Sequence, residues 1–165
     1  MLFIYHLLPG KSYNLSRKSK NLFKRIEAGG IVGVVSSFTV MEYISVMKRF
    51  ISSKIKRPIT YQETTIMKKM LMDFIAKMGI FLYDSDSLTV DATGYCSLFT
   101  ECEEFIEEHI PSKGADDKKW HTLNGPDALH LIFAIRTNST YLATFDDDFK
   151  DVKGQIKVMN VREAF

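Results

Sequence analysis

Three consecutive carboxylates, Asp146, Asp147 and Asp148, follow an apolar run that begins at Tyr141. Such a run is typical of a buried strand, and ligands in α/β proteins bind beyond the carboxyl ends of the strands. Carboxylates that lie close together repel one another unless a cation neutralises them, so this pattern indicates a metal site. A solvated acidic turn is the alternative interpretation of the same residues.

Two further acids occupy comparable places. Glu42 falls in the first turns of a helix expected after a strand over residues 31–35, and Asp127 opens an apolar helix before the strand that Asp146 ends. Because strand ends and helix starts gather at one edge of a parallel sheet, we expect Glu42, Asp127 and Asp146 to converge. Acids near helix N-termini are also stabilised by the helix dipole without any function, and this alternative stays open for Glu42 and Asp127.

The surroundings of Asp127 favour a ligand. The residues that follow it are apolar nearly all round the expected helix, which predicts a buried helix. An acid at the mouth of a buried helix, near a second acid, requires a counter-charge. Oxygen ligands alone suit Mg²⁺ or Mn²⁺, so one of these ions is the expected cofactor.

The pattern along the rest of the chain predicts the elements that must position these acids. We expect helices over residues 16–26, about 37–50, 60–78, 89–109 and 127–137, and strands over 31–35, 80–83, 141–145 and 155–160. Strands that alternate with helices predict a three-layer α/β fold with a parallel central sheet flanked by helices. A length of 165 residues predicts a single domain spanning 1–165.

Charge is distributed unevenly along the chain. Residues 1–60 carry 11 Lys and Arg against two Glu, whereas residues 61–165 carry 11 Lys and Arg against 18 Asp and Glu. A basic half suits a protein that binds a polyanion, although ordinary solvated helix faces are the alternative. The basic segment around residues 48–58 has interleaved apolar residues and supplies the candidates for contact with an RNA backbone: Lys48, Arg49, Lys54, Lys56 and Arg57.

The chain shows no sign of export or of membrane insertion. Its apolar runs are far shorter than a membrane span, and the first residues lack the basic leader and cleavage site of a signal peptide. Cys96 and Cys102 fit no metal or redox spacing, which is typical of the reducing cytoplasm. We therefore expect a cytoplasmic protein with no membrane partner.

Three segments together resemble the PIN-domain nucleases, a family that includes the VapC-type toxins of toxin–antitoxin pairs. They are residues 36–42, which end in Glu42, residues 127–131, which begin with Asp127, and residues 144–149, which contain Asp146 and Asp148. The resemblance implies a Rossmann-like sheet, a Mg²⁺ or Mn²⁺ site and hydrolysis of RNA phosphodiester bonds. It places catalytic and metal-binding roles on Glu42, Asp127 and Asp146, with Asp148 as an accessory metal ligand.

The same resemblance implies RNA as substrate, an antitoxin protein as partner and a homodimer. One departure concerns the first strand of the family and the aspartate that ends it. Residues 4–7 fit the helix that follows that strand, yet only three residues precede them. We therefore expect the natural chain to begin upstream of Met1. The alternative is a degenerate member: a non-catalytic module that binds RNA or a protein and has an incomplete acidic site.

Overall fold

The structure, a computed structural model, describes residues 2–7, 12–83, 97–108, 123–149, 152 and 156–164. The chain separates into two compact units, Met1–Asp84 and Ser85–Ala164, and each has a hydrophobic cluster of its own. The expectation of a single domain over 1–165 stays a prediction.

The first unit contains four helices and one pair of strands among its described residues. Their bounds are α1 (Leu2–Leu7), α2 (Tyr13–Glu27), β1 (Val34–Ser36), α3 (Ser37–Ile55), α4 (Tyr61–Lys77) and β2 (Phe81–Tyr83). Polar side chains start the longer helices: Ser12 caps α2, Ser36 caps α3, and Thr60 forms a capping box with Glu63 at α4. Each cap satisfies a backbone N–H that the first helical turn leaves without a partner.

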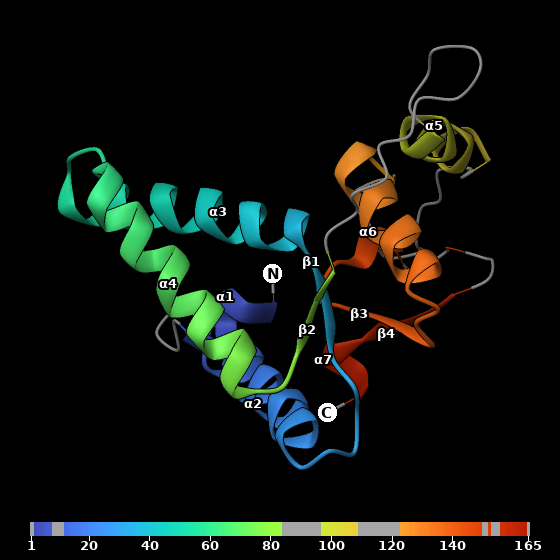
Figure 1. Cartoon of the computed structure of the whole chain (residues 1–165), viewed down its shortest axis with the longest axis horizontal. Coiled ribbons are helices and arrows are strands. Elements are labelled where there is room, and N and C mark those ends of the chain that lie inside the picture. The colour runs from blue at the N-terminus through green and yellow to red at the C-terminus, as the bar shows by residue number, and fades with distance from the viewer. Residues whose placement is uncertain are drawn as a thin grey trace. The chain divides into compact units, whose positions relative to one another are not determined.

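Helices α3 and α4 form a hairpin whose facing sides build the core of this unit (Figure 1). Buried side chains recur at helical spacing on both helices, as at Val40 and Met47 on α3 and at Met67, Leu71 and Ile75 on α4. Three- and four-residue spacing places these side chains on one stripe, and burial of that stripe drives the packing.

Several boundaries in the first unit differ from the sequence-based prediction. Helix α2 begins at Tyr13 behind its Ser12 cap, three residues before the expected start at residue 16. The strand expected over residues 31–35 is observed over Val34–Ser36, because its parallel partner β2 is only three residues long and pairs Val34 with Phe81. Helix α3 extends beyond the expected end near Phe50 to Ile55. Ser53 donates a hydrogen bond from Oγ to the Phe50 carbonyl at 2.7 Å, so it is accommodated within the helix.

The second unit contains α5 (Ser97–Glu108), α6 (Gly125–Arg136), β3 (Tyr141–Thr144), the 3₁₀ turn η1 (Asp147–Phe149), β4 (Lys157–Asn160) and α7 (Val161–Ala164). Strands β3 and β4 are parallel, with Tyr141 opposite Lys157 and Thr144 opposite Asn160. Helix α6 is buried on several sides, as the apolar sequence predicts, and Leu131 packs with Phe149 and Ile156.

The mixed α/β class with parallel strand pairing is confirmed. Within the described residues, each strand pair forms a sheet of two strands, β1 with β2 and β3 with β4. No helix in the described part of the chain has both the length and the apolar character needed to cross a membrane.

Candidate functional site

Asp127 lies in the first turn of α6, and a capping box fixes it there. The Asn124 backbone N–H donates to Oδ2 of Asp127 at 3.2 Å, and the Asp127 backbone N–H donates to Oδ1 of Asn124 at 3.1 Å. Only 9% of the Asp127 residue surface is exposed, so this is a buried acid. The sequence placed Asp127 at the first residue of the helix, whereas α6 begins two residues earlier at Gly125 behind its Asn124 cap.

The electrostatic surroundings of Asp127 include two other acids. Burial raises the pKa of the Asp127 carboxyl above its ordinary value of 3.8, and the negative charges of Asp146 and Asp148 raise this pKa further. The hydrogen bond from the Asn124 backbone N–H and the charge of the nearby His130 lower the pKa of Asp127. The charges of Asp146 and Asp148 therefore reach the Asp127 carboxyl, and a cation near these acids would relieve the repulsion.

The turn after β3 gives its successive acids different environments. The Asp146 backbone N–H donates to Oγ1 of Thr144 at 2.9 Å, and the Asp148 backbone N–H donates to Oδ1 of Asp146 at 3.1 Å. Asp147 instead accepts from Nδ2 of Asn160 at 3.2 Å and from Nη1 of Arg162 at 2.8 Å. Asp147 thus serves as an anchor for the turn, while Asp146 is exposed.

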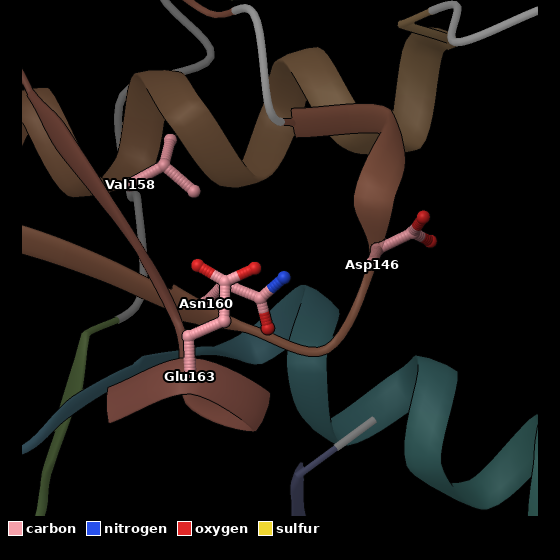
Figure 2. A pocket seen from close by; sticks show the side chains of 4 residues that line it. All are labelled: Asp146, Val158, Asn160 and Glu163. Carbon is pink, nitrogen blue, oxygen red and sulfur yellow. The ribbon is translucent and has the colours of Figure 1, made fainter. Parts of the chain in front are cut away.

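A partly open pocket of about 150 Å³ lies beyond the carboxyl ends of β3 and β4, lined by Asp146, Val158, Asn160 and Glu163. Figure 2 shows the Asn160 and Glu163 side chains in the middle of the view, with the Asp146 carboxylate directed away from them. This is the edge of a parallel strand pair where α/β folds place their ligands.

Asn160 and Glu163 were not among the candidates taken from the sequence. The sequence feature that indicates Asp146, an acid just after the end of a strand, also applies to Glu163, which lies three residues after the end of β4. Asn160 is the last residue of β4 and pairs in register with Thr144 at the end of β3. A search of every predicted strand end for polar residues would have included both.

Glu42, the remaining predicted metal ligand, is exposed on α3 in the first unit, whereas Asp127, Asp146 and Asp148 belong to the second. Its convergence with them stays a prediction. Among the described residues, no group of three or more His, Cys, Asp or Glu side chains is close enough to hold a metal ion. The carboxylates of the second unit fit Mg²⁺ or Mn²⁺ in donor type, and a complete site would require a further ligand or movement of these side chains.

The predicted RNA-binding residues lie at the end of α3 and just beyond it. Lys48, Arg49 and Lys54 are exposed on the helix, and the Lys54 ammonium lies 5.7 Å from the centre of the Phe50 ring. Arg57 differs from them, because its guanidinium donates to both carboxylate oxygens of Glu63 at 2.6 and 2.9 Å.

The Arg57–Glu63 pair is reflected in the acidity of the glutamate. Hydrogen bonds from Arg57, followed by those from the Thr60 backbone and side chain, lower the pKa of Glu63 to about 2. Arg57 is therefore committed to a partner within its own chain, and a phosphate would have to compete with this ion pair.

Searches of protein-family models, of curated proteins and of solved structures found no match to this chain. The resemblance to PIN-domain nucleases rests on the three sequence segments that carry it, and it stays a prediction.

Proposed function

We propose that this chain is a metal-dependent endoribonuclease of the PIN type, in which a parallel central sheet lies between two layers of helices. The observation that carries the proposal is that the charges of Asp146 and Asp148, which follow the carboxyl end of β3, reach the buried carboxyl of Asp127. A buried acid whose pKa is raised in this way is typical of sites that act on a ligand, and here the three acids coincide with two of the segments that resemble the family.

The hydrogen bonds of these acids suit a ligand-binding role. Asp127 and Asp146 each accept a backbone N–H on one oxygen, and no other hydrogen bond reaches either carboxylate in the described part of the chain. The backbone amides fix the direction of each carboxylate and leave its second oxygen available. When bound, Mg²⁺ or Mn²⁺ would activate a water molecule and neutralise charge that develops on the phosphate.

The remaining parts of the proposal extend from this site. Glu42 is the further metal ligand, Asp148 assists Asp146, and the exposed bases Lys48, Arg49, Lys54 and Lys56 bind the RNA backbone. We further propose that the protein acts in the cytoplasm as the toxin of a toxin–antitoxin pair, as a homodimer that an antitoxin protein inhibits.

Cleavage of a labelled single-stranded RNA by the purified chain, with Mn²⁺ and with EDTA, tests the proposal. Asp127→Asn and Asp146→Asn should each abolish Mn²⁺-dependent cleavage, whereas Asp73→Asn, which removes an exposed acid from α4, should leave it unchanged. Cleavage that persists in EDTA, or in both the Asp127→Asn and Asp146→Asn variants, would contradict the proposed metal-dependent nuclease site.

A non-catalytic module that binds RNA or a protein is the second candidate, and two observations favour it. The capping box gives Asp127 a structural role, and the described residues contain no metal-binding group of three. RNA binding without cleavage at any Mn²⁺ concentration, together with unchanged binding by Asp127→Asn, would favour this module over the nuclease.

A further inference from the structure

Helix α2 presents an exposed stripe of one aromatic residue and three bases. Tyr13, Arg17, Lys20 and Lys24 are spaced by four, three and four residues, and all four are exposed. At about 100° per residue, these intervals bring the four side chains within roughly 60° of one another around the helix axis. Tyr13 is 82% exposed and begins the stripe, which we call the α2 stripe.

The opposite face of α2 is fixed to the core of the first unit. Leu22 and Phe23 are buried there, and Ser19, whose surface is wholly covered, donates a hydrogen bond from Oγ to the Leu2 carbonyl at 2.8 Å. The α2 stripe is therefore held on a packed helix, so its charges keep their spacing.

Nothing within the described part of the chain neutralises this stripe. Arg17, Lys20 and Lys24 form no ion pair there, and Glu27, the last residue of α2, is the one acid of the helix. The positive charge of Lys20 even reaches His6, where it contributes to lowering the pKa of the imidazole. Like charges three and four residues apart on a helix repel one another, so a bound polyanion would stabilise this face.

We propose that the α2 stripe binds single-stranded RNA, with Arg17, Lys20 and Lys24 on successive phosphates and a base stacked on Tyr13. The exposed aromatic ring favours nucleic acid, because stacking on a tyrosine is available to any base. An anionic membrane surface is disfavoured, since an amphipathic helix binds lipid through an apolar face and that face of α2 is buried. The inference shares with the proposed function the choice of RNA as ligand, but it uses neither the acids nor the bases of α3.

Two charge-matched triple variants test the α2 stripe. One carries Arg17→Gln, Lys20→Gln and Lys24→Gln; the control carries Lys68→Gln, Lys69→Gln and Lys77→Gln, which removes three exposed bases from α4. Affinity for a fluorescent single-stranded RNA is measured by anisotropy in EDTA over a range of salt concentrations. The stripe variant should lose about 2 units of the slope of log K against log salt, at roughly 0.7 per phosphate contact, and the control should retain the wild-type slope.

Stacking is tested separately. Tyr13→Ala should weaken RNA binding about 5- to 150-fold, the range that corresponds to loss of one stacked base, and Tyr13→Phe should bind as the wild type does. Unchanged thermal melting in all variants confirms that the exposed substitutions leave the first unit folded.

Equal losses in the two triple variants would overturn the inference, because overall charge alone would then account for binding. The inference would also be overturned if the stripe variant bound RNA with wild-type affinity. A stripe variant that lost binding to phosphatidylserine vesicles but retained binding to RNA would overturn it as well. The outcome can be distinguished from that of the proposed function. RNA binding through α2 without Mn²⁺-dependent cleavage would support the α2 stripe and contradict the proposed nuclease. Mn²⁺-dependent cleavage by the wild type, together with a wild-type salt slope in the stripe variant, would support the nuclease and contradict the α2 stripe.

Discussion

Arg162 donates a hydrogen bond from Nη1 to Oδ2 of Asp147 at 2.8 Å and thereby ties α7 to the turn that follows β3. Asn160 completes the link, since its Nδ2 donates to the other Asp147 oxygen while its Oδ1 accepts the Arg162 backbone N–H at 2.9 Å. Asp146 and Asp148 flank the anchored residue, so this link positions the candidate site without belonging to it.

Arg162→Gln should therefore loosen the turn at little cost in stability. Arg162 and Asp147 are 44% and 32% exposed at their side chains, so solvent screening leaves the ion pair a contribution of about 0–1 kcal/mol. We expect faster hydrogen exchange of the Asp148 amide, which donates to Asp146, and weaker Mn²⁺ binding. Lys157→Gln removes an exposed base from β4 and serves as the control. Unaltered exchange at Asp148 would show that Arg162 does not hold the turn.

Asp127→Asn should stabilise the protein at neutral pH. The pKa of Asp127 is raised in the folded state, mainly by burial, so its ionised form is disfavoured there and stability falls as pH rises from about 3.8 through the folded-state pKa. An amide at this position avoids that cost and can still accept the Asn124 N–H. Urea unfolding should show a gain at pH 7 that disappears below pH 3.8.

Asn124→Ala provides the contrast to that variant. The free energy of unfolding of this variant should be lower by about 0.5–2 kcal/mol both at pH 7 and below pH 3.8, because the substitution removes the N-cap of α6. If Asp127→Asn instead destabilised the protein at pH 7, the charge of Asp127 would stabilise the start of α6 by more than its burial costs.

Glu63→Gln should release Arg57 for contact with RNA. Glu63 accepts both hydrogen bonds of the ion pair, and without its charge the guanidinium can turn to a phosphate. Anisotropy titrations in EDTA should show tighter RNA binding, with a salt slope steeper by about 0.7 for one added contact. The double variant Glu63→Gln, Arg57→Gln should return to the wild-type slope or below it. No change in either variant would remove Arg57 from the RNA-binding residues.

His6 should make the first unit sensitive to mild acid. The centre of its ring lies 4.7 Å from the ring centres of both Phe23 and Phe74, and its buried Nδ1 has no hydrogen-bond partner among the described residues. Burial, followed by the charge of Lys20, lowers the pKa of His6 below 6.5. A lowered folded-state pKa means that stability is complete above pH 6.5 and is lost as pH falls through the folded-state value.

Urea unfolding between pH 8 and pH 5 measures this loss, and His6→Phe should flatten the dependence because phenylalanine cannot be protonated. Lys20→Gln should move the NMR titration of His6 toward 6.5. A His6 that titrates above 6.5 in the wild type would contradict the burial argument.

Gly79→Ala should destabilise the first unit by about 1–2 kcal/mol through its backbone alone. Gly79 follows α4 with φ of 63°, a left-handed conformation that a Cβ disfavours. Apart from Gly79 and its chain neighbours, no atom of the described residues lies within 4 Å of the position that Cβ would occupy. Gly125→Ala is the matched control, since its site is equally open and lies in the first turn of α6. Equal melting temperatures for the two variants would show that no strain is stored at Gly79.

Local features of the structure could be predicted from the sequence. The run Asn124-Gly-Pro126 predicts the start of α6, and Thr60, at the start of the helix expected over residues 60–78, is the observed cap of α4. Caps and helical stripes depend on residues a few positions apart, so their physical cause is contained in a short window. Strand limits are different: β1 begins at Val34 because β2 offers partners only from Phe81 to Tyr83.

The sequence by itself determined that the chain is a mixed α/β protein with parallel strands and an acidic turn after β3. The family resemblance gave roles to Asp146 and Asp148 and none to Asp147, but three identical side chains in a row carry no sign of which one is paired within the chain. Tertiary structure decided this by bringing Asn160 and Arg162, 13 and 15 residues away, to one carboxylate. Such pairing depends on the register of β3 with β4 and on the direction of each side chain, and both are set only when the chain packs.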